Sequence, residues 1–166
     1  MQGLDDNDLK ILELLQRDGR ATHAAVGKAV GLSAPSVYAR IQRLEKSGVI
    51  RGYAAQLDPA GVGRGLAAFV RVTTRAITAS EEQDEFERFV LAEPLILECH
   101  DVDGEDSYIL KVRAATLESL RDLLARIRGI AAVSRTVTSI GMVTIKEEGV
   151  APLPANGPGA SRGKRS

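Results

Sequence analysis

Apolar side chains recur every three or four residues in three short segments near the start of the chain. The three stripes are Ile11, Leu12 and Leu15; Val26, Ala29 and Val30; and Val37, Ile41 and Leu44. This spacing places each set on one face of a helix, so the pattern predicts three amphipathic helices within residues 4–50.

Residues typical of helix ends flank each of these segments. Asp5, with Asp8 three residues later, Thr22 and Ser33 are the expected N-caps, and Gly19, Gly31 and Gly48 are the expected stops. Two short helices around a glycine-containing turn predict a helix-turn-helix. Residues 49–58 then alternate enough to predict a strand, a small wing buried against the helices through "GVI". A turn follows in "DPAGVGRG", residues 58–65.

The second half of the chain changes its period. Strand-like segments occupy residues 65–75, 94–102, 107–113 and 133–148, and amphipathic helical segments occupy residues 80–93 and 116–129. Ser80 and Thr116 are the expected helix caps, and "DGED" at residues 103–106 is the expected hairpin turn. The order β-α-β-β-α-β predicts an α+β fold of the ferredoxin-like kind, with both helices on one face of an antiparallel sheet.

The uncovered face of this sheet has outward positions that include apolar side chains. With the strand phase left open, the candidates are Val70, Val72, Ile109 and Val112. Such a face predicts self-association, as a dimer or a higher multiple. The resulting domain assignment is a winged helix-turn-helix in residues 1–56, a linker in 57–65, a ferredoxin-like domain in 66–148 and a disordered tail in 149–166.

Composition excludes several classes of protein. The chain of 166 residues is 44% hydrophobic and 27% charged, without an apolar run of membrane-spanning length. Its first residues lack a signal-peptide pattern, so a cytoplasmic location is expected. Cys99 is the single cysteine, and His23 and His100 are far apart in the sequence, so neither a disulfide, a metal site nor another cofactor is expected.

Charge is distributed unevenly along the chain. Residues 1–56 carry 8 Lys or Arg and 6 Asp or Glu, a net charge of +2. Residues 57–149 carry 11 and 16, a net charge of −5, and residues 150–166 carry 3 and none. A basic N-terminal part beside an acidic body favours a polyanionic partner for the helix-turn-helix.

Three stretches in this order resemble the Lrp/AsnC family of transcriptional regulators. They are "LDDNDLKILELLQRDGR", "GLSAPSVYARIQRLEKSGVIRGY" and "VDGEDSYILKVR", and the resemblance covers residues 4 to 147. It implies an N-terminal DNA-binding domain that recognises double-stranded DNA. It also implies a C-terminal ferredoxin-like domain that dimerises and binds a small metabolite, commonly an amino acid.

The helix that begins after Ser33 is the expected recognition helix. Its inward stripe leaves small and polar side chains outward, where they can approach base edges in the major groove. Arg43, Lys46 and Arg51 lie where phosphates would be. Arg40 lies beside the inward stripe, so an ion pair within the chain is its alternative. The expected DNA-binding residues are Ser33, Ala34, Ser36, Tyr38, Ala39, Gln42, Arg43, Lys46 and Arg51.

The hairpin turn before Tyr108 is the expected sensor loop, because the family's effector site occupies this position. A common form of the loop has Asp where this chain has Ser107, which leaves the effector's identity open. Threonines in the last strand line the family's effector pocket between dimers. Residues 136 and 138 share one face of a strand. The expected effector-binding residues are Gly104, Glu105, Asp106, Ser107, Thr136 and Thr138.

Other interpretations stay open at this point. The basic helix can be a solvated face, the loop a polar hairpin tip, and the threonines ordinary strand residues. Some tetrapyrrole decarboxylases share a similar two-domain architecture, with His100 as the sole candidate histidine in the second half. A DNA-architectural protein without a ligand is the third interpretation. The favoured one is a sequence-specific transcriptional regulator, not an enzyme, that responds to an amino acid or related metabolite.

Overall fold

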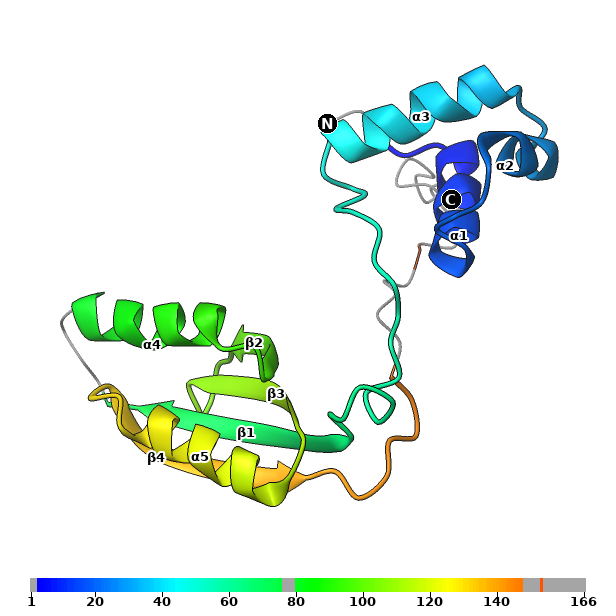
Figure 1. Cartoon of the computed structure of the whole chain (residues 1–166). Coiled ribbons are helices and arrows are strands. Elements are labelled where there is room, and N and C mark those ends of the chain that lie inside the picture. Colours follow the sequence, from blue (N-terminus) through cyan, green and yellow to red (C-terminus); the bar gives the residue numbers. More distant parts are fainter. Residues whose placement is uncertain (1–2, 76–79, 148–152, 154–166) are drawn as a thin grey trace, which may run out of the picture. The chain divides into compact units, whose positions relative to one another are not determined.

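The computed structural model describes residues 3–75, 80–147 and 153. Residues up to 56 belong to one compact unit, and residues 57–147 form a second one. The first unit contains α1 (Asp6–Arg17), α2 (His23–Val30) and α3 (Ala34–Lys46) (Figure 1). The second contains β1 (Leu66–Thr74), α4 (Ser80–Ala92), β2 (Ile96–Asp101), β3 (Tyr108–Ala114), α5 (Leu117–Arg128) and β4 (Val133–Ile140).

The three N-terminal helices begin where the sequence predicts. Asp5 accepts a hydrogen bond from the Asp8 backbone and the Asp8 side chain accepts one in return, which completes a capping box. The side chains of Thr22 and Ser33 accept backbone hydrogen bonds at the starts of α2 and α3. Gly31 ends α2 in the left-handed conformation, with a φ of 72°. These caps confirm the predicted starts of the three helices and the predicted end of α2. The other two helices end slightly earlier than expected, because Asp18 rather than Gly19 caps α1 and Ser47 rather than Gly48 caps α3.

A small apolar core joins the N-terminal helices. It consists of Ile11, Val26, Val37 and Ile41, with Leu14, Leu15, Ala21, Val30, Leu32 and Ile50 packed around it. Ala29, expected on the buried face of α2, is exposed, and Gly27 is buried in its place. The exchange follows from the backbone of the turn before α3, because the Leu32 carbonyl oxygen leaves no room for a side chain at Gly27.

Residues 49–58 do not form the predicted strand, and "GVI" is only partly buried. No part of the segment is a β-strand. Val49 is 46% exposed, whereas Ile50 packs against the core of the helices. A strand needs a hydrogen-bonded neighbour, and the described part of the N-terminal unit contains none. The turn expected in residues 58–65 is present, with Asp58 accepting backbone hydrogen bonds from Ala60 and Gly61.

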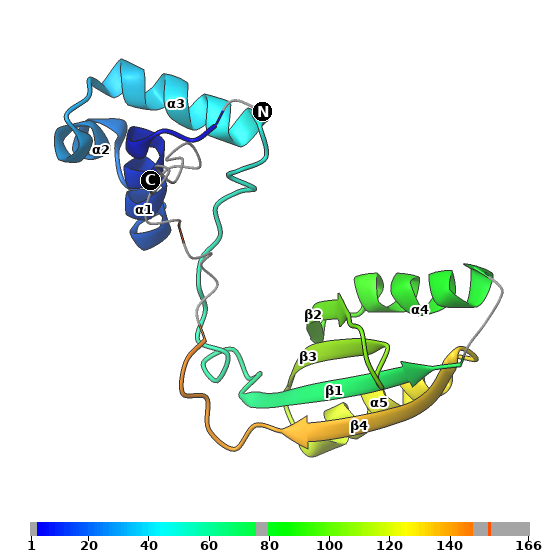
Figure 2. The same cartoon turned by 180° about the vertical axis from the view of Figure 1, so that it is seen from behind.

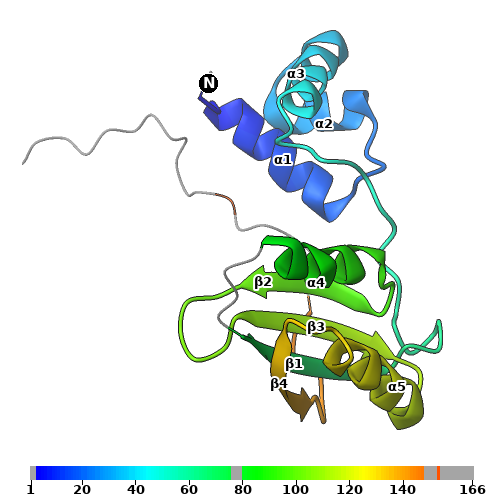
Figure 3. The ribbon, with the colours of Figure 1, turned by 90° about the vertical axis from the view of Figure 1, so that its left-hand side faces the viewer.

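The second unit is built on a four-stranded antiparallel sheet in the order β2-β3-β1-β4 (Figure 3). The order of elements is β-α-β-β-α-β, as the sequence predicts. Thr116 caps α5 as expected. Ser80 is the first residue of α4, but its side chain lies outside the described residues.

Both helices of this unit cover the same face of the sheet. Phe86 of α4 and Leu123 of α5 belong to one core with Val70 and Leu110 of the central strands. Figures 1 and 2, drawn from opposite sides, show α5 in front of the strands in one view and behind them in the other. The opposite face of the sheet carries no helix among the described residues.

The phase of the strands corrects the expected uncovered face. Val70, Val72 and Val112 are fully buried on the helix-covered side. Ile109 pairs with Arg71 in the register, one position away from these valines, so it lies on the uncovered face with Phe69. Apolar residues follow one another without strict alternation in β1 and β3, and the sequence pattern therefore leaves the phase undecided.

The last strand is shorter than predicted. β4 ends at Ile140, and the Gly141 N–H donates one further hydrogen bond to Ala67 near the start of β1. Beyond this point β1 offers no backbone to pair with, so residues 142–147 continue without a ladder. The predicted disordered tail, residues 149–166, lies outside the described residues apart from residue 153.

Candidate DNA-binding surface and effector site

The turn between α2 and α3 brings the two helices close together. A Cβ built at Gly27 would lie 2.5 Å from the Leu32 carbonyl oxygen, and the Leu32 N–H donates to the Gly27 carbonyl at 2.9 Å. Ser33 then starts α3, with Pro35 in the first turn, where its missing N–H leaves no helical hydrogen bond unmade. Two short helices joined by a turn that contains Gly31 match a helix-turn-helix.

The N-terminal part of α3 presents short or polar side chains to solvent. Ser33, Ser36, Tyr38 and Ala39 are exposed and Ala34 is half-buried, so all five predicted residues are accessible. The hydroxyls of Ser33 and Ser36 lie 2.9 Å apart. Tyr38 is 51% exposed, and its ring centroid lies 5.4 Å from that of His23 at the start of α2.

The C-terminal part of α3 combines accessible cations with an internal polar network. The Gln42 amide donates to the Glu45 carboxylate at 3.2 Å, and the Tyr53 hydroxyl donates to the same carboxylate at 3.0 Å. Burial raises the pKa of Tyr53 above its usual 10.0, and the hydrogen bond to Glu45 contributes a smaller increase. Lys46 and Arg51 are exposed beyond this network.

The other two cations of α3 turn back toward α1. Arg40 donates to Asp5 at 2.6 Å and to Asp8 at 2.8 Å, and Arg43 donates to both Asp8 oxygens at 2.6 and 2.5 Å. The bond from Arg40 holds the pKa of Asp5 below its usual 3.8, and the bond to Asp5 raises the pKa of Arg40. The ion pair considered for Arg40 is therefore present.

Asp8 is the functional candidate that the sequence did not reveal. Its carboxylate is fully buried, whereas the sequence assigned it only to the cap of α1. The sequence did contain one indication of this role: Asp8 is an acid on the same buried side of α1 as Leu9 and Leu12, and a charge buried there requires a partner.

The hairpin between β2 and β3 holds the predicted sensor residues. Gly104 has a φ of 136°, a backbone conformation that favours glycine, and Gly104 and Glu105 are exposed at the tip. Ser107 is tied to β1, because its hydroxyl oxygen accepts from the Thr74 backbone at 3.0 Å and from the Thr74 hydroxyl at 2.9 Å. Its position is therefore fixed by the sheet.

Asp106 faces the uncovered side of the sheet. Its carboxylate lies 3.7 Å from the guanidinium groups of both Arg71 and Arg135, and Thr73 donates to it at 3.4 Å. Only 14% of its side chain is exposed. The sequence did not single out Arg71 or Arg135 as partners, since they come from strands 29 or more residues away in the chain.

Thr136 and Thr138 lie on the other side of the sheet. Thr136 pairs with Val72 and Thr138 with Val70, so both half-buried threonines share the helix-covered face, as their spacing of two predicts. Val72 also pairs with Tyr108. Two strand spacings, about 10 Å, therefore separate Thr136 from Tyr108 at the end of the hairpin. A single copy does not bring all six predicted effector residues together.

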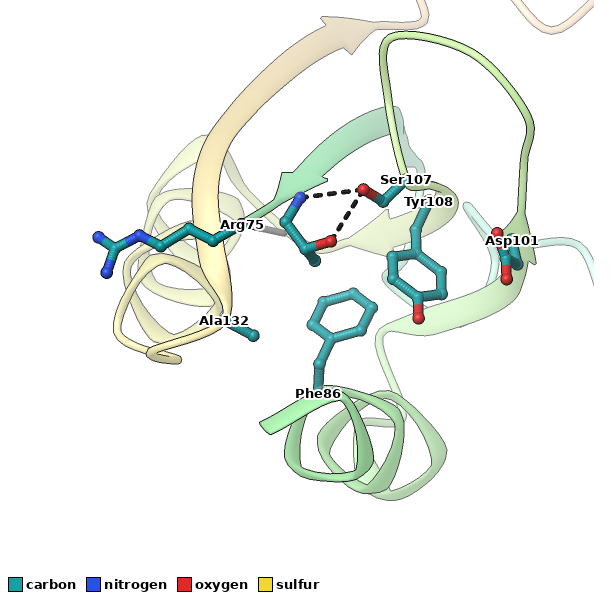
Figure 4. A pocket seen from close by; sticks show the side chains of 7 residues that line it. Arg75, Phe86, Asp101, Ser107, Tyr108 and Ala132 are labelled. Carbon is teal, nitrogen blue, oxygen red and sulfur yellow. Dashed lines mark hydrogen bonds between the residues drawn. The ribbon is translucent and has the colours of Figure 1, made fainter. Parts of the chain in front are cut away.

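A pocket of about 120 Å³ opens beside Ser107 on the helix-covered side (Figure 4). The rings of Phe86 and Tyr108 line it, with centroids 4.6 Å apart. Asp101 stands at one end, while the Arg75 side chain extends away from the two rings. Ser107 is the one predicted effector residue that lines this pocket.

Two family models together match almost the whole described chain. Residues 4–51 match a winged helix-turn-helix DNA-binding domain, and residues 67–151 match the Lrp/AsnC ligand binding domain. The chain belongs to the Lrp/AsnC family. Like the members it matches, it is a DNA-binding transcriptional regulator.

Named relatives of this Lrp/AsnC chain agree with the family models. The transcriptional regulator LrpA of Mycobacterium tuberculosis is 40% identical over 139 residues, which cover 84% of this chain and 91% of the relative. The leucine-responsive regulatory protein of Haemophilus influenzae is 37% identical and covers 88% of each chain.

Solved structures agree with this Lrp/AsnC chain in fold. An AsnC family regulator from Agrobacterium tumefaciens has a TM-score of 0.85 at 30% identity and covers 90% of this chain and 97% of its own. A Neisseria meningitidis regulator in complex with L-Met has a TM-score of 0.83 at 32% identity and covers 90% and 96%. In the parts of this Lrp/AsnC chain that the structure describes, no helix is long and apolar enough to span a membrane.

Proposed function

We propose that the chain reads its DNA site with the N-terminal part of α3 and responds to an amino acid or a related small metabolite. The observation that carries the first half is the outward face of α3, where small side chains leave room for base edges. The base-facing residues that we propose are Ser33, Ala34, Ser36, Tyr38, Ala39 and Gln42.

Lys46 and Arg51 are the phosphate contacts that we propose. Both are exposed, one at the end of α3 and one just after it. Arg43 was expected beside them, but its guanidinium is bound by Asp8, so we do not count it among the phosphate contacts. The chain acts in this proposal by binding rather than by catalysis, in the compartment that holds the DNA.

We propose that the regulator binds DNA as a dimer or a multiple of dimers. On the uncovered face of the sheet, Phe69 is 46% exposed, and Ile109 in the neighbouring strand is half-buried. A second copy of the chain packed on this face would bury both side chains. A twofold dimer presents two copies of α3, so its half-sites should lie about 10 bp, or multiples of that, apart.

Selection of bound sequences from a random DNA pool, followed by titration at several salt concentrations, tests this interface. We expect the Gln42→Ala and Ser36→Ala variants to select altered sequences. Lys46→Ala should weaken binding to every sequence and reduce the salt slope by about one unit. Arg121→Ala, which removes an exposed cation from α5, is the matched control. A wild-type protein that enriches no sequence would refute the proposal.

The second half of the proposal concerns the effector. An exposed Glu105 carboxylate can accept a charge-assisted hydrogen bond from an ammonium group, and the open backbone around Gly104 can bind a carboxylate. The L-Met complex of the Neisseria relative supports an amino acid as the ligand class.

Because Thr136 and Thr138 lie far from the hairpin in one copy, we propose that a neighbouring dimer completes the site. A ligand bound between dimers would then shift the oligomer and the spacing of its DNA-binding units. A tenfold preference for one assembly corresponds to about 1.4 kcal/mol per site.

Calorimetry with each of the twenty amino acids tests this site. We expect binding by at least one of them, weakened by Ser107→Ala and by Thr138→Val. Ser139→Ala changes an exposed hydroxyl on the same strand and is the matched control. A ligand whose affinity neither variant changes would place the effector elsewhere, and no binding at millimolar concentration would favour regulation without an amino-acid effector.

A further inference from the structure

The buried carboxylate of Asp8 is the centre of a charge network between α1 and α3. Its side chain is 0% exposed, and it accepts the Asp5 backbone N–H at 3.0 Å in addition to the bonds from Arg40 and Arg43. A carboxylate removed from water is stable only with such partners. Because water does not reach the buried carboxylate, the carboxylate keeps both guanidinium groups bound to it.

This network changes the charge that α3 presents to DNA. The helix has three cationic side chains, Arg40, Arg43 and Lys46, and two of them point back toward α1. Only 26% of the Arg40 side chain and 41% of the Arg43 side chain are exposed. Lys46 is the one cation of α3 that lies outside the network, and it is exposed.

Non-specific DNA binding comes from cations that neutralise phosphates, each of which adds about 0.9 to the slope of log K against log salt. Direct contacts to base edges carry the sequence information instead. A recognition helix with fewer available cations therefore loses affinity for random DNA and keeps the contacts that discriminate between sequences.

We propose that Asp8 is a specificity-determining positioning residue, which withdraws Arg40 and Arg43 from the DNA backbone and so holds down binding to random sequences. The proposal rests on α3 being the DNA-reading helix. It explains why an acid is buried at the helix-turn-helix of a protein whose partner is a polyanion.

The Asp8→Asn variant removes the charge while keeping nearly the same shape. Asp6→Asn is the matched control, since Asp6 is an exposed acid in the same first turn and the net charge changes equally. Affinities of the full chain for its selected sequence and for random DNA are measured over a range of salt, with helical content checked by circular dichroism.

We expect Asp8→Asn to steepen the salt slope for random DNA by about one to two units, because two guanidinium groups become available. Affinity for random DNA, which has only phosphate contacts, should rise more than affinity for the selected sequence, so the ratio of specific to random affinity should fall at low salt. Asp6→Asn should change the ratio far less. Equal effects of the two variants, or an unchanged slope in Asp8→Asn, would overturn the proposal. A merely structural loss would weaken binding without steepening the slope.

Arg43→Ala decides the question if Asp8→Asn does not fold. Since Arg43 is bound by Asp8 in the native protein, its removal should leave the salt slope within about half a unit of wild type, whereas Lys46→Ala lowers it by about one. A full unit lost in Arg43→Ala would overturn the proposal. Failure of wild type to prefer any sequence would instead refute the DNA-reading role of α3.

Discussion

Replacing Gly27 by alanine tests whether the tight turn between α2 and α3 holds α3 in the position needed to bind DNA. The new methyl group would lie 2.5 Å from the Leu32 carbonyl oxygen and 3.5 Å from a methyl group of Val37. The first distance is shorter than van der Waals contact allows, and the opposing atom belongs to the backbone of the turn. The turn has to move away from α2.

The two contributions to stability have opposite signs. Alanine is about 1 kcal/mol more favourable than glycine inside a helix. Overpacking a tight site costs about 1–3 kcal/mol, and the upper part of that range applies because backbone atoms rather than a flexible side chain must move. We expect a net loss of about 1–2 kcal/mol, which in a domain of this size lowers the melting temperature by about 4–8 °C per kcal/mol.

Thermal unfolding followed by circular dichroism measures the stability, and titration with the selected DNA measures the affinity of the folded protein. We expect Gly27→Ala to lose both, because moving the turn displaces α3. Ala29→Gly is the control: Ala29 is exposed in the same helix, so this change loses about 1 kcal/mol of helix propensity with the turn intact and the DNA affinity unchanged. A higher melting temperature in Gly27→Ala would refute the argument.

Three further predictions concern the second unit. The bonds from Lys111 hold the pKa values of Glu98 and Glu147 below their usual 4.5, so their contribution to stability is present above pH 4.5 and is lost as the pH falls through the lowered values. Urea unfolding across this range should show a smaller acid dependence in Lys111→Met, and an equal dependence would contradict the assignment. Phe86→Ala should cost about 3–5 kcal/mol in the same assay, since Phe86 is fully buried. Phe69→Asp should weaken self-association in sedimentation experiments, and an unchanged oligomer would place the dimer interface elsewhere.

Local features of the fold could be predicted because they depend on neighbouring residues. The caps at Asp5, Thr22, Ser33 and Thr116 each involve a side chain and a backbone group three residues apart. The order of helices and strands also follows from periodicity. The strand expected in residues 49–58 failed, because alternation marks a segment that can pair but supplies no partner.

Most of the candidate DNA-binding surface could be predicted by the same reasoning, but the effector site could not. Accessibility along α3 follows from its apolar stripe, so the outward residues could be named in advance. The hairpin and the threonines were grouped through the family resemblance, but the register separates them by about two strand spacings and places Asp106 on the opposite face.

The sequence by itself determined the helix-turn-helix, the α+β order and the family, since periodicity, caps and short motifs are properties of adjacent residues. Only the tertiary structure decided which face of each strand is covered, and that Arg43 binds Asp8 rather than lying free. Asp8 and Arg43 are 35 residues apart, and no local pattern links them. Their contact arises because α1 and α3 pack on one core, and a carboxylate buried there binds whichever cations the packing brings within reach.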